Sequence, residues 1–362
     1  MATFHVLPPQ KYEKNKSILN PQAVVYVLKD ITSPFLSAYQ RNLGLPERNF
    51  MTQILESQDI RALGSNLELL AQQVVEGFIV GLHRSPFHGF SVEFAEHRLY
   101  NPGESTRNLD WKVYGRTDKL FSKRYEEETN LRCHIVVDGS STMYYPWDEK
   151  NPEKYKYSNK FCFAAQSAAV LMNALKKQRD AFSLTLFDNE LRFSSGAKSS
   201  TVHYRLLLSK LVESIENPQL NKTTDLAKSL HQVAEAFHRR SLVVIFTDVM
   251  EHPDKADDIF AALQHLRHAK HEVILFHVTD KQKELDFEFE NRPYVFVDME
   301  NGEEVRLQPS QVKEFYIKQV AAFTEQLRMK CLQFKIDFVE ADIQRGFVPI
   351  LQTWMAKRAK LG

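Results

Sequence analysis

Cysteine is scarce in this sequence, and long apolar runs are missing. Among 362 residues there are only three cysteines, Cys133, Cys162 and Cys331, and they lie far apart. Two of them stand in apolar strand or helix patterns, which favours buried, reduced thiols. No segment reaches the roughly 18 uninterrupted apolar residues of a transmembrane helix, and residues 1–10 lack the apolar core of a secretory signal. We therefore expect a cytoplasmic protein without a membrane span.

Excess charge of either sign is also missing. Lys and Arg number 47 and Asp and Glu number 46, a net charge of +1. This balance gives no electrostatic reason to expect nucleic acid or an anionic membrane as a ligand. The sequence has no P-loop, no dinucleotide-binding fingerprint and no Gly-x-Ser-x-Gly elbow. We therefore expect neither ATP hydrolysis nor serine hydrolase chemistry from this chain.

Beyond residue 131, apolar strand patterns alternate with amphipathic helix patterns. Continuous apolar strands separated by helices predict an α/β fold, a doubly wound, mostly parallel sheet covered on both faces. An Asn-Gly pair at Asn301 predicts a hairpin turn. The predicted strands end at Val137, Phe187, Phe193, Phe246, Phe276, Val297, Leu307 and Val339, and the longer helices cover about 158–177 (capped by Ser158), 256–267, 310–330 and 347–358.

The chain before residue 131 is patterned differently. Residues 1–57 are broken by prolines and form an N-terminal extension of unclear fold, in which 23–28 are either a strand or a turn of helix. Residues 58–130 combine a helical pattern over 59–80 with short alternating pieces, which predicts a small helix and β-rich subdomain. Residues 131–362 form the main domain.

Oxygen-bearing side chains gather where the strong strands end. Asp138, Ser140 and Thr142 follow the strand that ends at Val137, and Asp248 follows the strand that ends at Phe246. Thr224 stands in a polar loop that opens a helix. Because ligands of open parallel sheets bind beyond the carboxyl ends of the strands, these side chains are expected at one crevice. Their hard oxygen atoms suit Mg²⁺, Mn²⁺ or Ca²⁺, with Mg²⁺ preferred.

These three pieces, in this order, resemble the metal-ion-dependent adhesion site of von Willebrand factor A domains. The third position of the first loop, usually Ser, is Thr142, which keeps the hydroxyl, and Thr223 stands where glycine is usual. The resemblance implies that Asp138, Ser140 and Thr142 hold the cation directly or through water. It also implies that Thr224 is a switchable ligand, that Asp248 binds directly or through water, and that an acidic side chain of a partner completes the shell.

A longer pattern resembles the bacterial von Willebrand A-like family catalogued as domain of unknown function fifty-eight. The match runs from about residue 60 to Arg358 and includes the charged block from Gly103 to Glu128. This resemblance implies a MoxR-type AAA+ ATPase as partner and a chaperone-like role in the maturation of a client protein. The residues that carry it include Glu76, Gly77, Gly81, Pro86, Tyr100, Pro102, Gly103, Arg107, Asp110, Trp111, Arg116, Lys123, Tyr125, Glu128, Asp298 and Gly302.

The charged block has two interpretations. It is either a salt-bridged platform that fixes the small subdomain to the sheet, or a docking surface for the ATPase. The docking surface comprises Arg107, Asp110, Trp111, Arg116, Lys123 and Glu128.

Two other functions stay open. Asp138 after a strand loosely resembles the nucleophile of haloacid-dehalogenase-type phosphatases, but the position of their general acid is Ser140, which cannot act as that acid. The other open alternative is a scaffold protein whose metal site stays empty. We favour a non-enzymatic, metal-dependent protein-binding module. His265, His268 and His271 are interpreted as a solvated helix end.

Overall fold

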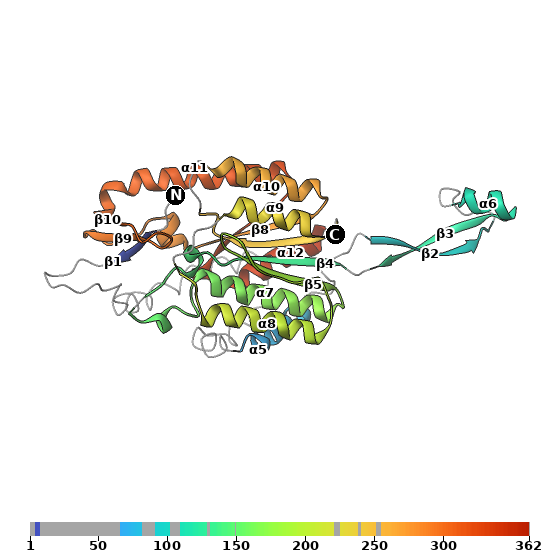
Figure 1. Cartoon of the computed structure of the whole chain (residues 1–362), viewed down its shortest axis with the longest axis horizontal. Helices are drawn as coiled ribbons and strands as arrows, with labels where there is room; N and C mark the ends of the chain where they lie inside the picture. Colours follow the sequence, from blue (N-terminus) through green and yellow to red (C-terminus); the bar gives the residue numbers. More distant parts are fainter. Residues whose placement is uncertain are drawn as a thin grey trace.

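The molecule is an α/β protein from which a long hairpin projects (Figure 1). The structure is a computed structural model. It describes residues 4–7, 66–81, 91–101, 109–128, 131–148, 150–220, 225–237, 240–250 and 255–361. The predicted N-terminal extension, residues 1–57, therefore lies mostly outside the described part of the chain, as does its segment 23–28.

The central sheet has the order β11-β8-β7-β4-β5-β6. All of its neighbouring pairs are parallel except β5 with β6. The three central strands are apolar and almost wholly buried because helices cover both faces. The predicted doubly wound, mostly parallel sheet is thus confirmed. Its strands are β4 (Arg132–Asp138), β5 (Ala181–Phe187), β6 (Leu191–Ser194), β7 (Leu242–Thr247), β8 (Glu272–Thr279) and β11 (Asp337–Asp342).

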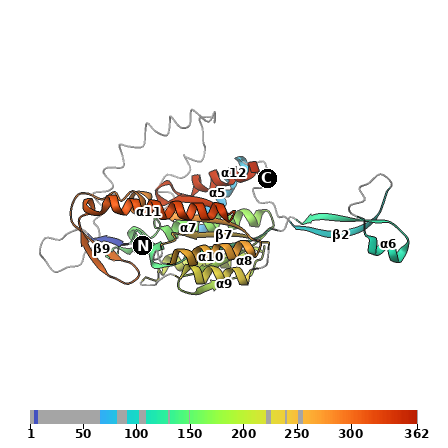
Figure 2. The ribbon, with the colours of Figure 1, turned by 90° about the horizontal axis from the view of Figure 1, so that it is seen from above.

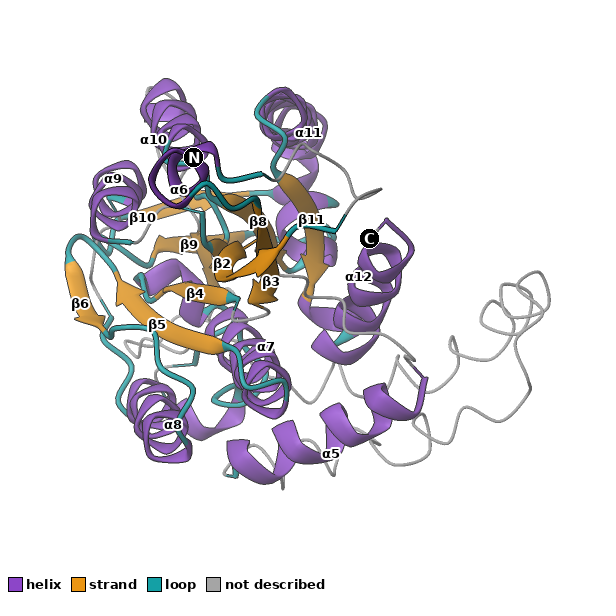
Figure 3. Cartoon of the chain, turned by 90° about the vertical axis from the view of Figure 1, so that its right-hand side faces the viewer, coloured by secondary structure: helices purple, strands orange, loops and turns teal. Residues whose placement is uncertain are grey.

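Two groups of helices cover the two faces of this sheet, as the end-on view shows (Figure 3). Each group encloses its own apolar core against the strands. On one face lie α5 (Leu67–Gly81), α7 (Lys160–Lys177), α8 (Thr201–Glu216) and α12 (Phe347–Leu361), and on the other α9 (Leu226–Ala236), α10 (Ala256–His268) and α11 (Pro309–Gln333).

Helix α5 contributes to the main core although it precedes the projecting hairpin in the chain. Its apolar side chains Leu67, Leu70 and Val74 are each no more than 1% exposed and belong to the core that contains α7 and α8. These residues recur at helical spacing, so one stripe of the helix faces its neighbours. The range 58–130 therefore contains two parts in different surroundings, a helix in the main core and a hairpin outside it.

The hairpin forms an arm that extends away from the body (Figures 1 and 2). Strands β2 (Ser91–Leu99) and β3 (Phe121–Glu128) pair antiparallel along their length, with an irregularity between Phe94 and Glu96. The short helix α6 (Trp111–Thr117) lies at the tip. Since β3 leads into β4, the arm joins the body at the amino ends of the parallel strands.

A small second sheet lies at the opposite end of the body (Figure 1). It has the order β1-β9-β10 and joins β1 (Phe4–Leu7) to the hairpin of β9 (Tyr294–Asp298) and β10 (Glu304–Leu307). The turn predicted at Asn301 is confirmed, and Gly302 has φ +76°, a conformation in which glycine carries no steric cost.

Two local predictions need correction. Asn159, not Ser158, caps α7, because the Asn159 side chain accepts the Cys162 N–H. The last strand runs over 337–342 instead of 334–339. Helix α11 continues to Gln333, so that Phe334 becomes its C-cap.

Candidate metal centre

The first and third loops of the predicted site meet at the carboxyl edge of the sheet. Strands β4 and β7 are adjacent and parallel, with Val137 paired with Phe246. Asp138 ends β4, and Asp248 comes directly after β7. The two aspartates therefore lie at the same edge of the sheet, and the negative charge of Asp248 acts on Asp138.

The first loop gathers three oxygen-bearing side chains. The Asp138 carboxylate accepts the Ser140 N–H at 2.9 Å on Oδ1 and the Thr247 hydroxyl at 2.7 Å on Oδ2. The Ser140 Oγ and Thr142 Oγ1 atoms are 3.1 Å apart. All three of these predicted ligands are buried. One carboxylate and two hydroxyls thus converge as the sequence predicts, and the Thr142 hydroxyl lies beside that of Ser140.

Glycine at position 139 allows this loop to lie close against β5. The Gly139 N–H donates to the Phe187 carbonyl at 2.7 Å. A Cβ atom at this position would lie 3.3 Å from both the Phe187 carbonyl oxygen and the Arg192 Nη1 atom. The absence of a side chain at Gly139 therefore permits a close approach of the loop to β5.

The electrostatics of Asp138 favour a nearby cation. Burial, reinforced by the negative charge of Asp248, raises the pKa of Asp138 to about 7, although the hydrogen bonds from Thr247 and Ser140 act in the opposite direction. A carboxylate that is costly to ionise in isolation becomes favourable when a divalent ion lies beside it. Hydroxyl and carboxylate oxygens are also the ligands that Mg²⁺ prefers, so these residues fit such an ion.

The third loop is tightly constrained. The Thr247 hydroxyl donates to Asp138 and accepts the Val249 N–H at 3.1 Å, which ties the third loop to the first. Val249 has φ +52°, an unfavourable conformation for a β-branched residue. Strain of this kind concentrates at functional sites, where the surrounding structure holds it in place.

Asp248 has a partner that the sequence did not reveal. The Lys160 Nζ atom lies 2.7 Å from Asp248 Oδ2 and 2.5 Å from Glu284 Oε1. Lys160 belongs to the first turn of α7, and Glu284 to a π-helical turn after β8, residues 281–285. Lys160 directly precedes the apolar run that starts at Phe161, and Glu284 lies in an ordinary polar stretch. Neither position carried a sequence signal for this pairing.

In the second loop of the predicted site, which precedes α9, the structure describes Asp225. The predicted ligand Thr224 lies outside the described residues. Asp225 caps α9, and its N–H donates to the Asp188 carbonyl at 3.4 Å. Asp188 belongs to the turn between β5 and β6, so this turn connects the start of α9 with the first loop, which bonds to Phe187.

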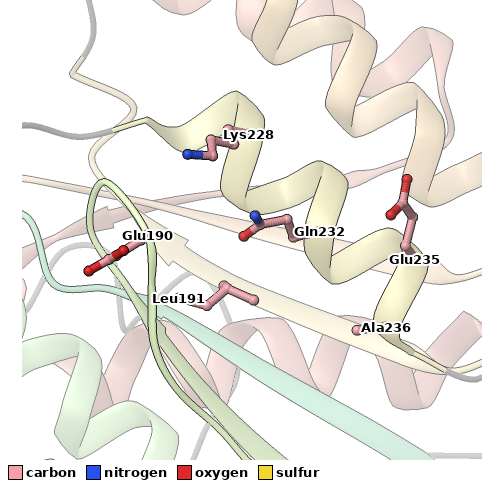
Figure 4. A pocket seen from close by; sticks show the side chains of 6 residues that line it. All are labelled: Glu190, Leu191, Lys228, Gln232, Glu235 and Ala236. Atoms are coloured by element: carbon pink, nitrogen blue, oxygen red, sulfur yellow. The ribbon is translucent and has the colours of Figure 1, made fainter.

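An open groove begins at this turn and follows α9 (Figure 4). Its volume is about 600 Å³. Glu190 stands on the turn, while the polar side chains of Lys228, Gln232 and Glu235 come from successive turns of α9. Leu191 and Ala236 complete the lining. The groove offers both signs of charge next to the edge that carries Asp138.

The predicted docking residues lie on the arm. Asp110 caps α6 by accepting the N–H groups of Lys112 and Val113, and Trp111 is 63% exposed. Arg116 is exposed in the last turn of α6, Lys123 and Glu128 belong to β3, and Arg107 lies outside the described residues. The arm holds this block away from the central sheet (Figure 1), which argues against a platform that fixes it to the sheet.

The three histidines of the α10 region are not a simple solvated helix end. His271 is fully buried, and its Nδ1 accepts the Ser241 N–H at 3.3 Å. The Nδ1 atoms of His265 and His231 lie 3.0 Å apart. Across the described residues, His, Cys, Asp and Glu side chains form no group of three that could hold a metal. The candidate centre combines the Asp138 carboxylate with the hydroxyls of Ser140 and Thr142.

The chain belongs to the family described as "Protein of unknown function DUF58", which matches residues 96–326. The resemblance drawn from the charged block is therefore confirmed. An uncharacterized protein of Mycobacterium bovis (strain ATCC BAA-935 / AF2122/97) is 30% identical over 89 residues. Another from Mycobacterium tuberculosis (strain ATCC 25618 / H37Rv) has the same identity over the same length. In both cases the aligned segment covers 25% of this chain and only 28% of the relative.

Several solved structures are similar at low sequence identity. The conserved hypothetical protein BatB from Bacteroides thetaiotaomicron is 16% identical, with 64% of this chain and 99% of that chain covered and a TM-score of 0.37. An aerotolerance-related membrane protein from Bacteroides fragilis NCTC 9343 is 15% identical, with 64% and 100% covered and a TM-score of 0.39. The VWA domain of SpRpn10 is 12% identical, with 41% and 75% covered and a TM-score of 0.28.

Among the helices of the described residues, none is long and apolar enough to cross a membrane. The three cysteines, all within the described residues, are buried and form no disulfide bond.

Proposed function

We propose that this chain is a non-enzymatic protein-binding module that depends on a divalent metal ion. The observation that carries this proposal is the convergence of a buried carboxylate, Asp138, with the hydroxyls of Ser140 and Thr142 at the carboxyl edge of the sheet. Membership of a von Willebrand A-like family supports the same reading.

In this proposal Asp138, Ser140 and Thr142 hold the ion, most simply Mg²⁺, with Mn²⁺ and Ca²⁺ as alternatives. Thr224 supplies a further hydroxyl, and Asp248 contributes its charge from the third loop. A site with mainly hydroxyl ligands leaves net positive charge on the ion, so that it attracts an acidic group from outside. The metal thereby supplies an open position for a Glu or Asp side chain of a partner.

The partner that we propose is a MoxR-type AAA+ ATPase, with the complex acting on a client protein in a chaperone-like way in the cytoplasm. The groove along α9 supports a peptide-like contact, because it lies beside the metal edge and offers Lys228 between Glu190 and Glu235. The segment that carries the partner's acidic side chain can continue into this groove.

The arm is proposed as a second contact surface for the ATPase. Its tip exposes Trp111 and Tyr114, which lie edge to face with ring centroids 6.3 Å apart, together with Arg116. Exposed Trp, Tyr and Arg side chains are those that dominate the binding energy of protein interfaces.

Calorimetry tests the metal site directly. Mg²⁺ and Mn²⁺ are titrated into the wild-type chain, into Asp138→Ala and into Glu213→Ala, a control that removes an exposed carboxylate on α8. We expect binding by the wild type and by the control and no binding by Asp138→Ala. Equal binding by all three proteins would refute the site.

Two further assays separate the alternative functions. A phosphatase screen tests the enzyme reading, since turnover that disappears in Asp138→Asn would replace our proposal. A pull-down with and without EDTA, read by mass spectrometry, tests the scaffold reading. A partner that stays bound in EDTA supports a metal-free scaffold, whereas release by EDTA supports a metal-dependent module.

A further inference from the structure

A buried ammonium group lies next to the proposed metal site. Lys160 has 0% of its side chain exposed, while its partners Asp248 and Glu284 are 2% and 5% exposed. The Tyr145 ring lies over the same ammonium, 5.8 Å from its centroid. Lysine is almost never fully buried unless it is paired, and here its two partners come from segments far apart in the sequence.

Lys160 holds Asp248 in a defined position. Asp248 Oδ2 is bound by the Lys160 ammonium, and Asp248 Oδ1 accepts the Met250 N–H at 3.1 Å. The next strand fixes the same loop, since His277 Nε2 donates to the Asp248 backbone carbonyl at 3.0 Å. Both carboxylate oxygens of Asp248 are therefore engaged, whereas the Ser140 hydroxyl contacts the Thr142 hydroxyl and the Asp138 side chain.

The net negative charge of the cluster favours a divalent cation. The Lys160 ammonium pairs with the carboxylates of Asp248 and Glu284, and the negative charge of Asp248 acts on Asp138. When all four groups are ionised, three carboxylates accompany one ammonium. Two negative charges then remain, which a divalent cation balances. Lys160 thus offsets one of the two negative charges of Asp248 and Glu284. One uncompensated charge remains on that pair and the other on Asp138, beside the two hydroxyls.

We propose that Lys160 is a resident cation that competes with the metal ion for Asp248 and keeps this carboxylate out of direct coordination. The inference rests on the proposed metal-binding function and adds a residue that sets the affinity of the site. The ion is then held mainly by the first loop, and its remaining positions stay available to an acidic partner.

The test compares the wild type with a double variant that has the same net charge in the cluster. Lys160→Met together with Glu284→Gln removes one positive and one negative charge and frees Asp248 from its ammonium. We expect Mn²⁺ to bind this double variant about tenfold more tightly than the wild type in calorimetry, which corresponds to one additional favourable contact. The single variant Glu284→Gln serves as control, because it keeps Lys160 on Asp248, and should bind more weakly than the wild type.

Each outcome decides one question. Binding by the wild type with equal or weaker binding by the double variant would overturn the role of Lys160 and leave the proposed function intact. Binding by the double variant alone would support Lys160 as a cation in place of the metal and refute a metal-dependent wild type. No binding by either protein would refute both ideas.

A second variant tests the same inference without touching the lysine. Asp248→Asn keeps the Lys160–Glu284 pair, so the cluster retains a partner for its ammonium. If Asp248 lies outside the direct shell, this variant should bind Mn²⁺ within about threefold of the wild type, less than the tenfold change of a lost contact. A loss as complete as that expected for Asp138→Ala would show that Asp248 is a direct ligand and would overturn the inference.

Discussion

Replacing Lys160 by Met should destabilise the protein strongly in the absence of metal. Methionine retains a flexible, unbranched side chain of similar volume, so the change removes a charge and leaves little cavity. Two carboxylates, at 2.7 and 2.5 Å from the lost ammonium, then remain buried without their cation. Breaking a buried ion pair in this way costs about 3–5 kcal/mol. A loss of this size is a large fraction of the roughly 5–15 kcal/mol by which native proteins are stable.

Urea denaturation in EDTA measures this loss, and its pH dependence identifies the cause. Burial raises the pKa of Glu284 to about 7 even with Lys160 in place, and removal of the ammonium raises it further. A raised carboxyl pKa means that stability falls as the pH rises through the folded-state value. The deficit of Lys160→Met should therefore be larger at pH 8 than at pH 5.5, and Glu284→Gln should recover part of it. A Lys160→Met protein within about 1 kcal/mol of the wild type at pH 8 would refute the assignment of a buried ion pair.

Three further changes should have separable effects. Thr247→Val removes the hydroxyl that joins Asp138 to the Val249 N–H and should cost about 2–4 kcal/mol of unfolding free energy. Thr247→Ser keeps a hydroxyl and should retain most of the wild-type stability. Equal urea midpoints for the two variants would contradict a stabilising role of this hydroxyl. Burial lowers the pKa of His271 below 6.5, so its contribution to stability is complete above pH 6.5 and is lost as the pH falls below that value. His271→Asn keeps an acceptor for the Ser241 N–H. Its urea midpoint should fall less than that of the wild type between pH 7.5 and pH 5. Equal falls of the urea midpoint in the two proteins would exclude His271 as the titrating group. Trp111→Ala, at an exposed position on the arm, should change the unfolding free energy by less than about 0.5 kcal/mol but weaken retention of the ATPase in a pull-down; unchanged retention would argue against the arm as a docking surface.

The fold and the first loop follow from the sequence because their signals are local. Apolar strands such as that ending at Val137 can only be buried between helix layers, and the position of Asp138 after this strand sets the edge on which it lies. The pairing of β4 with β7, which brings Asp138 and Asp248 together, agrees with that reasoning. The cap of α7 was misplaced by one residue because Ser158 and Asn159 are both good N-caps, and only the backbone geometry distinguishes them.

The charge cluster depends on distant contacts and was not predictable in the same way. Lys160 and Glu284 are 124 positions apart, and neither has a neighbour in sequence that identifies the other. A lysine at the start of a helix usually reaches solvent, and only the packing of α7 against the sheet directs Lys160 inward. The arm was likewise beyond sequence reasoning, because alternating pieces over 87–127 predict strands but not whether these strands pack on the body.

The attachment of the arm to β4 sets a length requirement for any partner that uses both proposed surfaces. The arm enters the body at the first residue of this strand, Arg132, and the candidate centre begins at its last, Asp138. A strand rises about 3.3 Å per residue, so these surfaces are separated by at least roughly 20 Å of sheet, to which the arm adds its own extension. A single short loop cannot reach both. A single partner must therefore span the long axis of the molecule. Alternatively, two subunits of a ring-shaped partner must bind separately, one to the arm and the other to the candidate metal centre.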